Sequence, residues 1–253
     1  MPYDLLKLNN EFEKSSAVSL LQWALQTFGE KLTVSSSFGA EDVVIIDILT
    51  KFEPKIRIFT LDTGRLNEET YQVMDEVRKK YGIQIQSYFP DSDSVENLER
   101  VKGFYSFRES VDNRKECCQL RKVEPLLRAL QGMEAWITGL RRSQAVTRTD
   151  IQKIENDDAH PGLVKINPLA DWSEKDVWGY IKKNAVPYNR LHDLGYRSIG
   201  CAPCTRAVKP DEDVRAGRWW WENTEQKECG IHLKQKEEDR GQRTDESSSK
   251  TGQ

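Results

Sequence analysis

Hydrophobic residues follow two alternating patterns along the first three quarters of the chain. Some segments place apolar residues three or four positions apart and carry a Ser cap or a terminal Gly, which predicts helices. Between them lie short segments that are typical of strands, the first of them buried. The predicted helices are residues 15–29, 40–52, 67–82 and 173–185. The predicted strands are residues 31–37, 55–62, 83–89 and 134–140.

Strands that alternate with helices predict an α/β fold, with a parallel twisted sheet and helices on both of its faces. No clear break divides residues 1–233, so we expect one domain in which a cysteine-bearing appendage, residues 191–233, lies over the α/β unit of residues 1–190. No apolar residue follows Leu233. Residues 234–253 are therefore expected to form a disordered polar tail.

The composition narrows the class of protein. It is 37% hydrophobic and 31% charged, as in globular proteins that are soluble, and a net charge of −3 argues against a nucleic-acid partner. The chain has no run of about 18 apolar residues, so we expect no membrane span. Its first residues lack the apolar core of a secretory signal, so we expect a cytoplasmic protein with reduced thiols.

Three polar loops follow predicted strands. The sequence "SSSFGAED" (35–42) follows the first strand, "LDTGR" (61–65) ends the second, and "GLRRSQ" (139–144) follows the fourth. Taken singly, each is compatible with an ordinary turn or a solvated arginine. Because the carboxyl ends of parallel strands meet at one edge of the sheet, the three together favour an anionic, nucleotide-like ligand.

Four cysteines occur as two pairs, Cys117 with Cys118 and Cys201 with Cys204. Adjacent cysteines cannot easily form a disulfide with each other, because their Cα atoms lie about 3.8 Å apart. Four thiolates suit either Zn²⁺ or an iron–sulfur cluster. The alternatives are buried free cysteines, or a thioredoxin-like redox role for the "CAPC" pair alone.

The fifth cysteine, Cys229, stands in "KECGIHL" (227–233), just before the polar tail. The neighbouring Lys227 would lower the pKa of the thiol and increase its thiolate fraction, as a nucleophile requires. The alternative is a stray exposed cysteine.

Taken together, these motifs resemble the assimilatory adenylylsulfate/phosphoadenylylsulfate (APS/PAPS) reductases, and most closely their iron–sulfur branch. The resemblance spans roughly residues 15–233. It rests on seven segments that follow the family's order: "SSFGAED", "LDTGR", "ECCQLRK", "GLRRSQ", "GCAPCT", "RAGRWWW" and "KECGIHL". It implies an adenine-nucleotide alpha-hydrolase-like fold.

The resemblance also implies a reaction. The Cys229 thiolate would attack the sulfur of APS and release AMP, leaving an enzyme S-sulfocysteine. Thioredoxin, or a similar dithiol protein, would then release sulfite, which feeds cysteine biosynthesis. The two cysteine pairs, Cys117 with Cys118 and Cys201 with Cys204, would bind one [4Fe–4S] cluster per subunit.

The family pattern further implies a set of residues that bind the substrate. These are Ser35, Ser36, Ser37, Gly39, Gly64, Arg65, Lys122, Arg141, Arg142, Arg215, Arg218 and His232. A reductase that uses PAPS, or both nucleotides, is the near alternative. An ATP-pyrophosphatase and a non-enzymatic zinc-binding module are more remote, and a homo-oligomer is compatible with the sequence.

Overall fold

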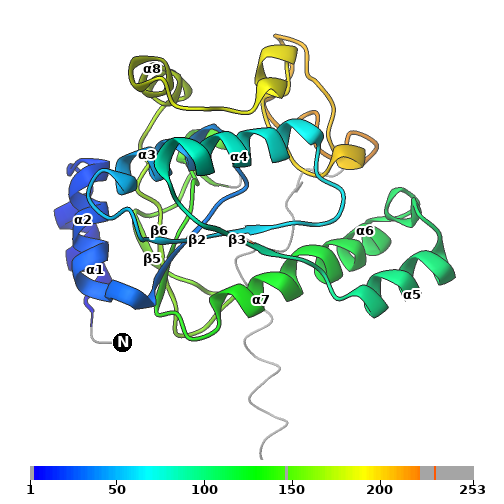
Figure 1. Ribbon diagram of the computed structural model, residues 1–253, viewed down its shortest axis with the longest axis horizontal. Coiled ribbons are helices and arrows are strands. Elements are labelled where there is room, and N and C mark those ends of the chain that lie inside the picture. Colours follow the sequence, from blue (N-terminus) through cyan, green and yellow to red (C-terminus); the bar gives the residue numbers. More distant parts are fainter. Residues whose placement is uncertain (1–2, 146–147, 223–230, 232–253) are drawn as a thin grey trace, which may run out of the picture.

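The computed structural model describes residues 3–145, 148–222 and 231 (Figure 1). The predicted tail, residues 234–253, lies outside this part of the chain, as do Cys229 and His232. No helix in the described part is both long enough and apolar enough to cross a membrane.

Within the described residues, six strands form one sheet in the order β3-β2-β1-β4-β6-β5. Their bounds are β1 Leu32–Ser35, β2 Arg57–Leu61, β3 Ile85–Tyr88, β4 Ala135–Ile137, β5 Ile154–Asn156 and β6 Val164–Ile166. The first four lie within the predicted strands, and they pair in parallel.

The predicted parallel sheet is confirmed, with one antiparallel strand at its edge. Strand β6 is parallel to β4, but β5 pairs with β6 in the antiparallel sense. Residues 157–163 are all that connects β5 to β6, and so short a connection can join only antiparallel neighbours. Both strands are three residues long and carry a charged side chain, so neither stands out in the sequence.

Four of the helices match the predicted ones: α2 Ala17–Phe28, α3 Ala40–Thr50, α4 Glu68–Tyr81 and α8 Glu174–Asn184. Two begin as the sequence predicts, because Ser16 accepts a hydrogen bond from the Ser19 N–H and Ser173 forms a reciprocal cap with Asp176. The structure adds four helices that were not predicted: α1 Leu5–Phe12, α5 Ser92–Lys102, α6 Val111–Cys118 and α7 Glu124–Leu130.

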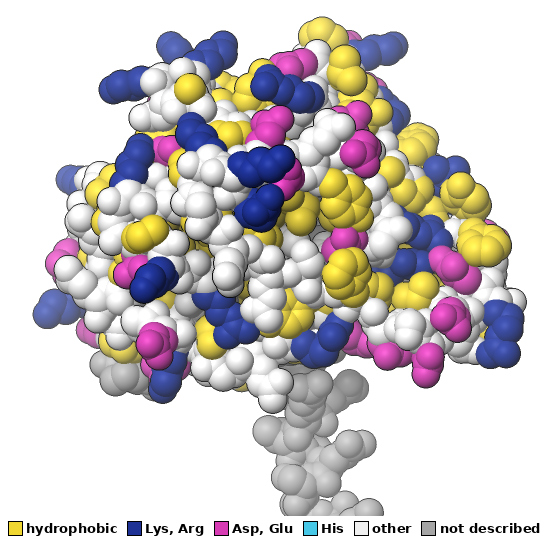
Figure 2. All heavy atoms as spheres, viewed as in Figure 1, with side chains coloured by type: hydrophobic (Ala, Val, Ile, Leu, Met, Phe, Trp, Pro, Cys, Tyr) yellow, Lys and Arg dark blue, Asp and Glu magenta, His cyan; other side chains and the backbone are white. Residues whose placement is uncertain are grey.

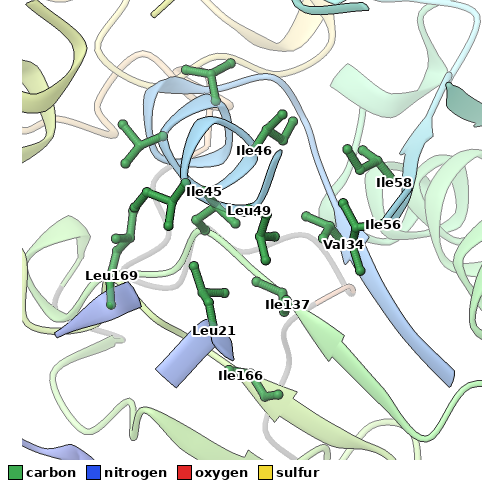
Figure 3. Packing of buried hydrophobic residues seen from close by; sticks show 14 of the residues in the cluster. Leu21, Val34, Ile45, Ile46, Leu49, Ile56, Ile58, Ile137, Ile166 and Leu169 are labelled. Carbon is green, nitrogen blue, oxygen red and sulfur yellow. The ribbon is translucent and has the colours of Figure 1, made fainter. Parts of the chain in front are cut away.

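Helices cover both faces of the sheet, as the fold class requires. Figure 1 shows α3 and α4 on one side of the sheet and α7 on the other. Alternate strand residues face the two layers. Ile58 and Ile137 pack with α2 and α3 in the main core (Figure 3), whereas their neighbours Phe59 and Trp136 pack against α7.

The segment after α8 runs back over α4 (yellow to orange in Figure 1). It contains two short turns, η6 Arg190–Leu194 and η7 Ala202–Cys204. An isolated antiparallel bridge joins Thr205 to Arg218, so the chain doubles back beside the second cysteine pair. On the face drawn in Figure 2, Lys and Arg side chains are interspersed with Asp and Glu rather than gathered into one basic patch.

Helix α6 continues into α7 through a π-helical turn, η3 Gln119–Val123. The wider turn begins directly after Cys118 and contains both Arg121 and Lys122. Such turns change the direction in which successive side chains point, and they are frequent at functional sites.

The main core predicts a large effect of truncating α3. Leu49 is fully buried, so Leu49→Ala is expected to lower the free energy of unfolding by about 2–5 kcal/mol through lost burial and a cavity. Leu6→Ala is the matched control, because Leu6 in α1 is 76% exposed and its truncation is expected to change stability by less than about 0.5 kcal/mol. Urea denaturation of the two variants measures both values, and equal effects would contradict this description of the core.

Candidate functional site

A cleft of about 230 Å³ opens at the carboxyl ends of β1, β2 and β4. One wall is the loop between β1 and α3, and another is the segment after α8. This is the sheet edge at which the sequence predicts a ligand. Eight of the predicted substrate-binding residues line the cleft: Ser35, Ser36, Ser37, Gly39, Lys122, Arg141, Arg215 and Arg218.

The loop after β1 is held by its own polar groups. The Ser36 hydroxyl accepts a hydrogen bond from the Phe38 N–H, and Phe38 adopts a left-handed conformation with φ 58° while its ring is fully buried. Gly39 then caps the N-terminus of α3. The loop thus presents hydroxyl groups and the first turn of a helix toward the cleft, an arrangement that suits an anion.

Asp42 fixes this loop from inside the first turn of α3. Its carboxylate accepts hydrogen bonds from the backbone N–H and the hydroxyl of Ser37, at 2.6 and 2.9 Å. Burial raises the pKa of Asp42 to about 6, although these hydrogen bonds from Ser37 act in the opposite direction. Gly139 makes room for the carboxylate, since a Cβ atom at position 139 would overlap it.

Arginine and lysine side chains also line the cleft. Arg141 is buried and donates to Glu41 at 2.7 Å, so its charge is balanced within the protein. Arg218 is only 6% exposed. Among the described residues, no carboxylate lies within ion-pair distance of Arg218, and its Nε–H has no partner. An anion in the cleft would supply the missing acceptor.

The structure does not bring three of the predicted substrate-binding residues to the cleft. Arg142 points away and forms a two-pronged ion pair with Glu13, at 2.7 and 2.9 Å. Arg65 pairs with Glu99 at 2.8 Å and lies beside the cysteines. Gly64 is exposed, with φ 70°, and packs near Arg121.

Two buried arginines belong to the site but were not predicted. Arg148 lines the cleft and donates to Gln144 at 2.6 Å. Arg121 lies beside the cysteines and donates to the Thr63 carbonyl at 2.7 Å and to Glu99 at 2.6 Å. Arg121 follows Cys118 by three residues, so helical spacing within "CCQLRK" was the available signal for it.

The four cysteines expected to bind a cluster line one small cavity. Cys117 and Cys118 come from the end of α6, and Cys201 and Cys204 flank the turn η7. All four are free thiols. The cavity shares Cys201 and Lys122 with the cleft, so the two spaces adjoin.

The cavity is chemically suited to an anionic metal cluster. Two buried N–H donors on its wall, Arg121 Nε and Trp219 Nε1, have no partner in the described part of the chain. Sulfide or thiolate sulfur could accept from both. Burial raises the pKa of Cys117, and it raises the pKa of Cys204 to about 12. The raised pKa values favour the neutral thiols, and a bound metal would supply positive charge that favours the thiolates. In the described part of the chain, no three Cys, His, Asp or Glu side chains are grouped as ligands of a single metal ion.

Cys229 and His232, the remaining predicted site residues, lie outside the described residues. Ile231, which stands between them in the sequence, is described. It lines the cleft and packs against the cluster around Phe59 and Leu126 on the α7 face of the sheet.

The fold and the cleft together define a mixed α/β protein of the kind that binds its ligand beyond the carboxyl ends of parallel strands. The chain belongs to the phosphoadenosine phosphosulfate reductase domain family, whose model matches residues 31–207. It is 50% identical over 222 residues to an adenosine 5'-phosphosulfate reductase from Allochromatium vinosum, which covers 88% of this chain and 86% of the relative. It is 46% identical over 237 residues to the chloroplastic 5'-adenylylsulfate reductase 3 of Arabidopsis thaliana, covering 90% of this chain and 51% of that protein.

Solved structures agree with this assignment. A phosphoadenylyl-sulfate (PAPS) reductase from Candida auris, in complex with phosphate, matches with a TM-score of 0.68 and 34% identity, covering 80% of this chain and 95% of that one. The FMN adenylyltransferase of Candida glabrata in complex with ATP shares the fold alone, with a TM-score of 0.52 and 14% identity.

The raised pKa of Asp42 predicts a specific dependence of stability on pH. A buried carboxyl group whose folded pKa is about 6, against 3.8 ordinarily, keeps its proton longer in the folded state than in the unfolded state. Its contribution therefore makes the unfolding free energy fall by about 3 kcal/mol between pH 4 and pH 6, and it adds no further change above that range. We expect Asp42→Asn to remove this fall. Urea denaturation of both proteins at several pH values measures it, and parallel profiles would refute the assignment.

Proposed function

We propose that this protein reduces adenylylsulfate to sulfite and AMP through a covalent intermediate on Cys229, in assimilatory sulfate reduction. The observation that carries the proposal is the junction of two spaces. One is a strand-end cleft with a buried arginine that has no acid partner among the described residues, and the other is a cavity lined by four cysteines. Two similar curated proteins are named as reductases of the same nucleotide.

The cleft suits both parts of such a substrate. The loop of Ser35, Ser36 and Ser37 with Gly39 supplies hydroxyl donors and a helix N-terminus near the strand ends. Lys122 and Arg218 lie close enough to Cys204 to act on it electrostatically, and Arg215 lines the same cleft, so the three suit the phosphosulfate group. The nucleoside would then lie over the strand ends and the sulfate would approach the cysteine cavity.

The chemistry needs a nucleophile at the sulfate. The Cys229 thiolate attacks the sulfur, the bond from sulfur to the bridging oxygen breaks, and AMP leaves with that electron pair. A thiolate of the dithiol partner then attacks Cys229 Sγ and sulfite leaves, after which the second thiol of the partner restores Cys229. The partner supplies both electrons and ends as a disulfide. Ile231 at the cleft supports this role, because it follows Cys229 by only two residues.

The residues present fit a [4Fe–4S] cluster held by Cys117, Cys118, Cys201 and Cys204. Four thiols around one cavity match its ligand number, and its irons are separate, so the thiols need not converge on one point. When bound, the cluster supplies a compact body of charge next to Lys122, close to where the sulfate would lie. Zn²⁺ is the alternative occupant, and colour and iron content distinguish the two.

Phosphoadenylylsulfate is the second candidate substrate, because the similar solved structure from Candida auris is that of a PAPS reductase. Steady-state turnover with each nucleotide decides between them, and we expect a higher kcat/KM with adenylylsulfate. We also propose a thioredoxin-type electron donor, a cytoplasmic location and a single reductase domain over residues 1–233.

The first prediction concerns the nucleophile. Without a reductant, the wild-type protein is expected to release about one AMP per active site from adenylylsulfate and to gain the mass of a sulfite group on Cys229. Cys229→Ser is expected to bind the nucleotide and release none, because a hydroxyl is far less nucleophilic than a thiolate. Rapid-quench chromatography and intact-mass measurement give both results. Sulfite production by the Ser variant would refute the mechanism.

The second prediction concerns the cysteine cavity. Cys118→Ser removes one of four thiolates, so we expect anaerobically purified protein to lose most of its iron, its sulfide and its brown colour. Cys229→Ser, which spares the four ligands, is the matched control and is expected to keep all three. Full iron content in Cys118→Ser would show that the ligand set is wrong.

A further inference from the structure

The side chain of Arg218 must be held at the cleft without an acid partner among the described residues. A buried guanidinium is normally fixed by a carboxylate, but Arg218 has none among the described residues. Its one side-chain hydrogen bond in this part of the structure is a long one, 3.5 Å from Nη1 to the Ser198 hydroxyl. Other contacts must therefore keep the charge at the cleft when no anion is bound.

One such contact is the ring of Trp219. The Arg218 guanidinium carbon lies 4.7 Å from the ring centroid, within the range of cation–π attraction. Trp219 is itself firmly placed: it is 1% exposed, its ring also lies 4.5 Å from the guanidinium of Arg114, and Arg114 pairs with Glu222 at 2.5 Å. Trp219 has φ 45°, a conformation that bulky residues rarely adopt.

The other contact is Gly200, which directly precedes Cys201 and lines the cleft. A Cβ atom at position 200 would lie 2.6 Å from Arg218 Cζ, closer than real Cβ contacts allow, and 3.1 Å from Arg218 Nε, which is tighter than most such contacts. The guanidinium therefore lies against the bare Cα of this glycine. The φ of Gly200 is outside the left-handed region. A side chain at position 200 would therefore be excluded by overlap with Arg218 and not by backbone strain.

The backbone of Gly200 is anchored on both sides of its Cα. Its N–H donates to the Thr205 hydroxyl at 3.1 Å, and its carbonyl accepts from the Asn67 side chain at 3.3 Å. The backbone of Arg218 is paired with Thr205 in the isolated bridge. Because both backbones are held, the overlap caused by a methyl group at position 200 would be relieved by movement of the Arg218 guanidinium.

We propose that Gly200 is a positioning residue for substrate binding: with Trp219, it holds the Arg218 guanidinium at the cleft, where the guanidinium meets the anionic group of the substrate. The inference rests on the proposed function. It assigns Gly200 a task separate from the neighbouring ligand Cys201, since Gly200 acts on substrate affinity through Arg218.

A double-mutant cycle tests this. The reference is the full-length, iron-loaded protein carrying Cys229→Ser, so that adenylylsulfate is bound but not consumed, and binding is measured by calorimetry. Gly200→Ala is expected to weaken adenylylsulfate binding roughly tenfold, by displacing a charge-assisted contact. In an Arg218→Ala background, the same change is expected to alter affinity less than about twofold, because the side chain on which it acts is gone.

Gly179→Ala is the matched control. It makes the same chemical change in α8, where a Cβ atom meets nothing within 4 Å, so affinity is expected to stay unchanged. Trp219→Leu is a second arm, expected to weaken binding several-fold with Arg218 present and not without it. Iron content and visible absorbance are measured for every variant and are expected to match the reference.

Three results would overturn the inference: unchanged affinity in Gly200→Ala, an equal loss in both backgrounds, or loss of iron from both the Gly200 and the Trp219 variants. The last would assign these residues to the cysteine cavity alone. A reference protein that binds no adenylylsulfate would overturn the proposed function and this inference with it. Adenylylsulfate binding that Gly200→Ala leaves unaffected would overturn the inference only.

Discussion

Burying a guanidinium group is the constraint around which this site is built. Arg114, Arg121, Arg141 and Arg218 are all less than a tenth exposed, and each lies at the cleft or the cysteine cavity. A charge removed from water must be balanced or it costs several kcal/mol. Three of the four are balanced by Glu222, Glu99 and Glu41. Of these four, only Arg218 has no carboxylate partner in the described structure, so its charge is the one left for a ligand to balance.

The pairing of buried charges with distant acids also explains why the sequence could place the loops but not the side chains. The strands, the helices next to them and the loops at their carboxyl ends follow from periodicity and caps, which are local. Whether Arg141 or Arg142 enters the cleft depends on Glu13, which lies more than a hundred residues earlier and pairs with Arg142. Arg65 was expected beside the nucleotide and instead shares Glu99 with Arg121. No local pattern reports such long-range pairings.

What remained unpredicted in the fold has a similar origin. Strands β5 and β6 are short and partly charged, and they are fixed by pairing with each other and with β4. Helix α6 has little amphipathic pattern and α7 is only seven residues long. The π-helical turn between them joins a cysteine pair to Arg121 and Lys122. The sequence marked those cysteines by their rarity and grouping. Their common cavity became visible only when two segments about eighty residues apart were brought together.

The cleft also keeps apart two groups that would stabilise each other. Asp42, with its raised pKa, and Arg218, without an acid partner, both line it. In the described structure no ion pair joins them, although both lie at the wall of the cleft. Asp42 is held by Ser37 on the α3 side, whereas Arg218 is held by Trp219 and Gly200 on the cysteine side. A ligand that brings its own negative charge can therefore gain the interaction with Arg218 that Asp42 does not make, as expected of a site preorganised for an anion.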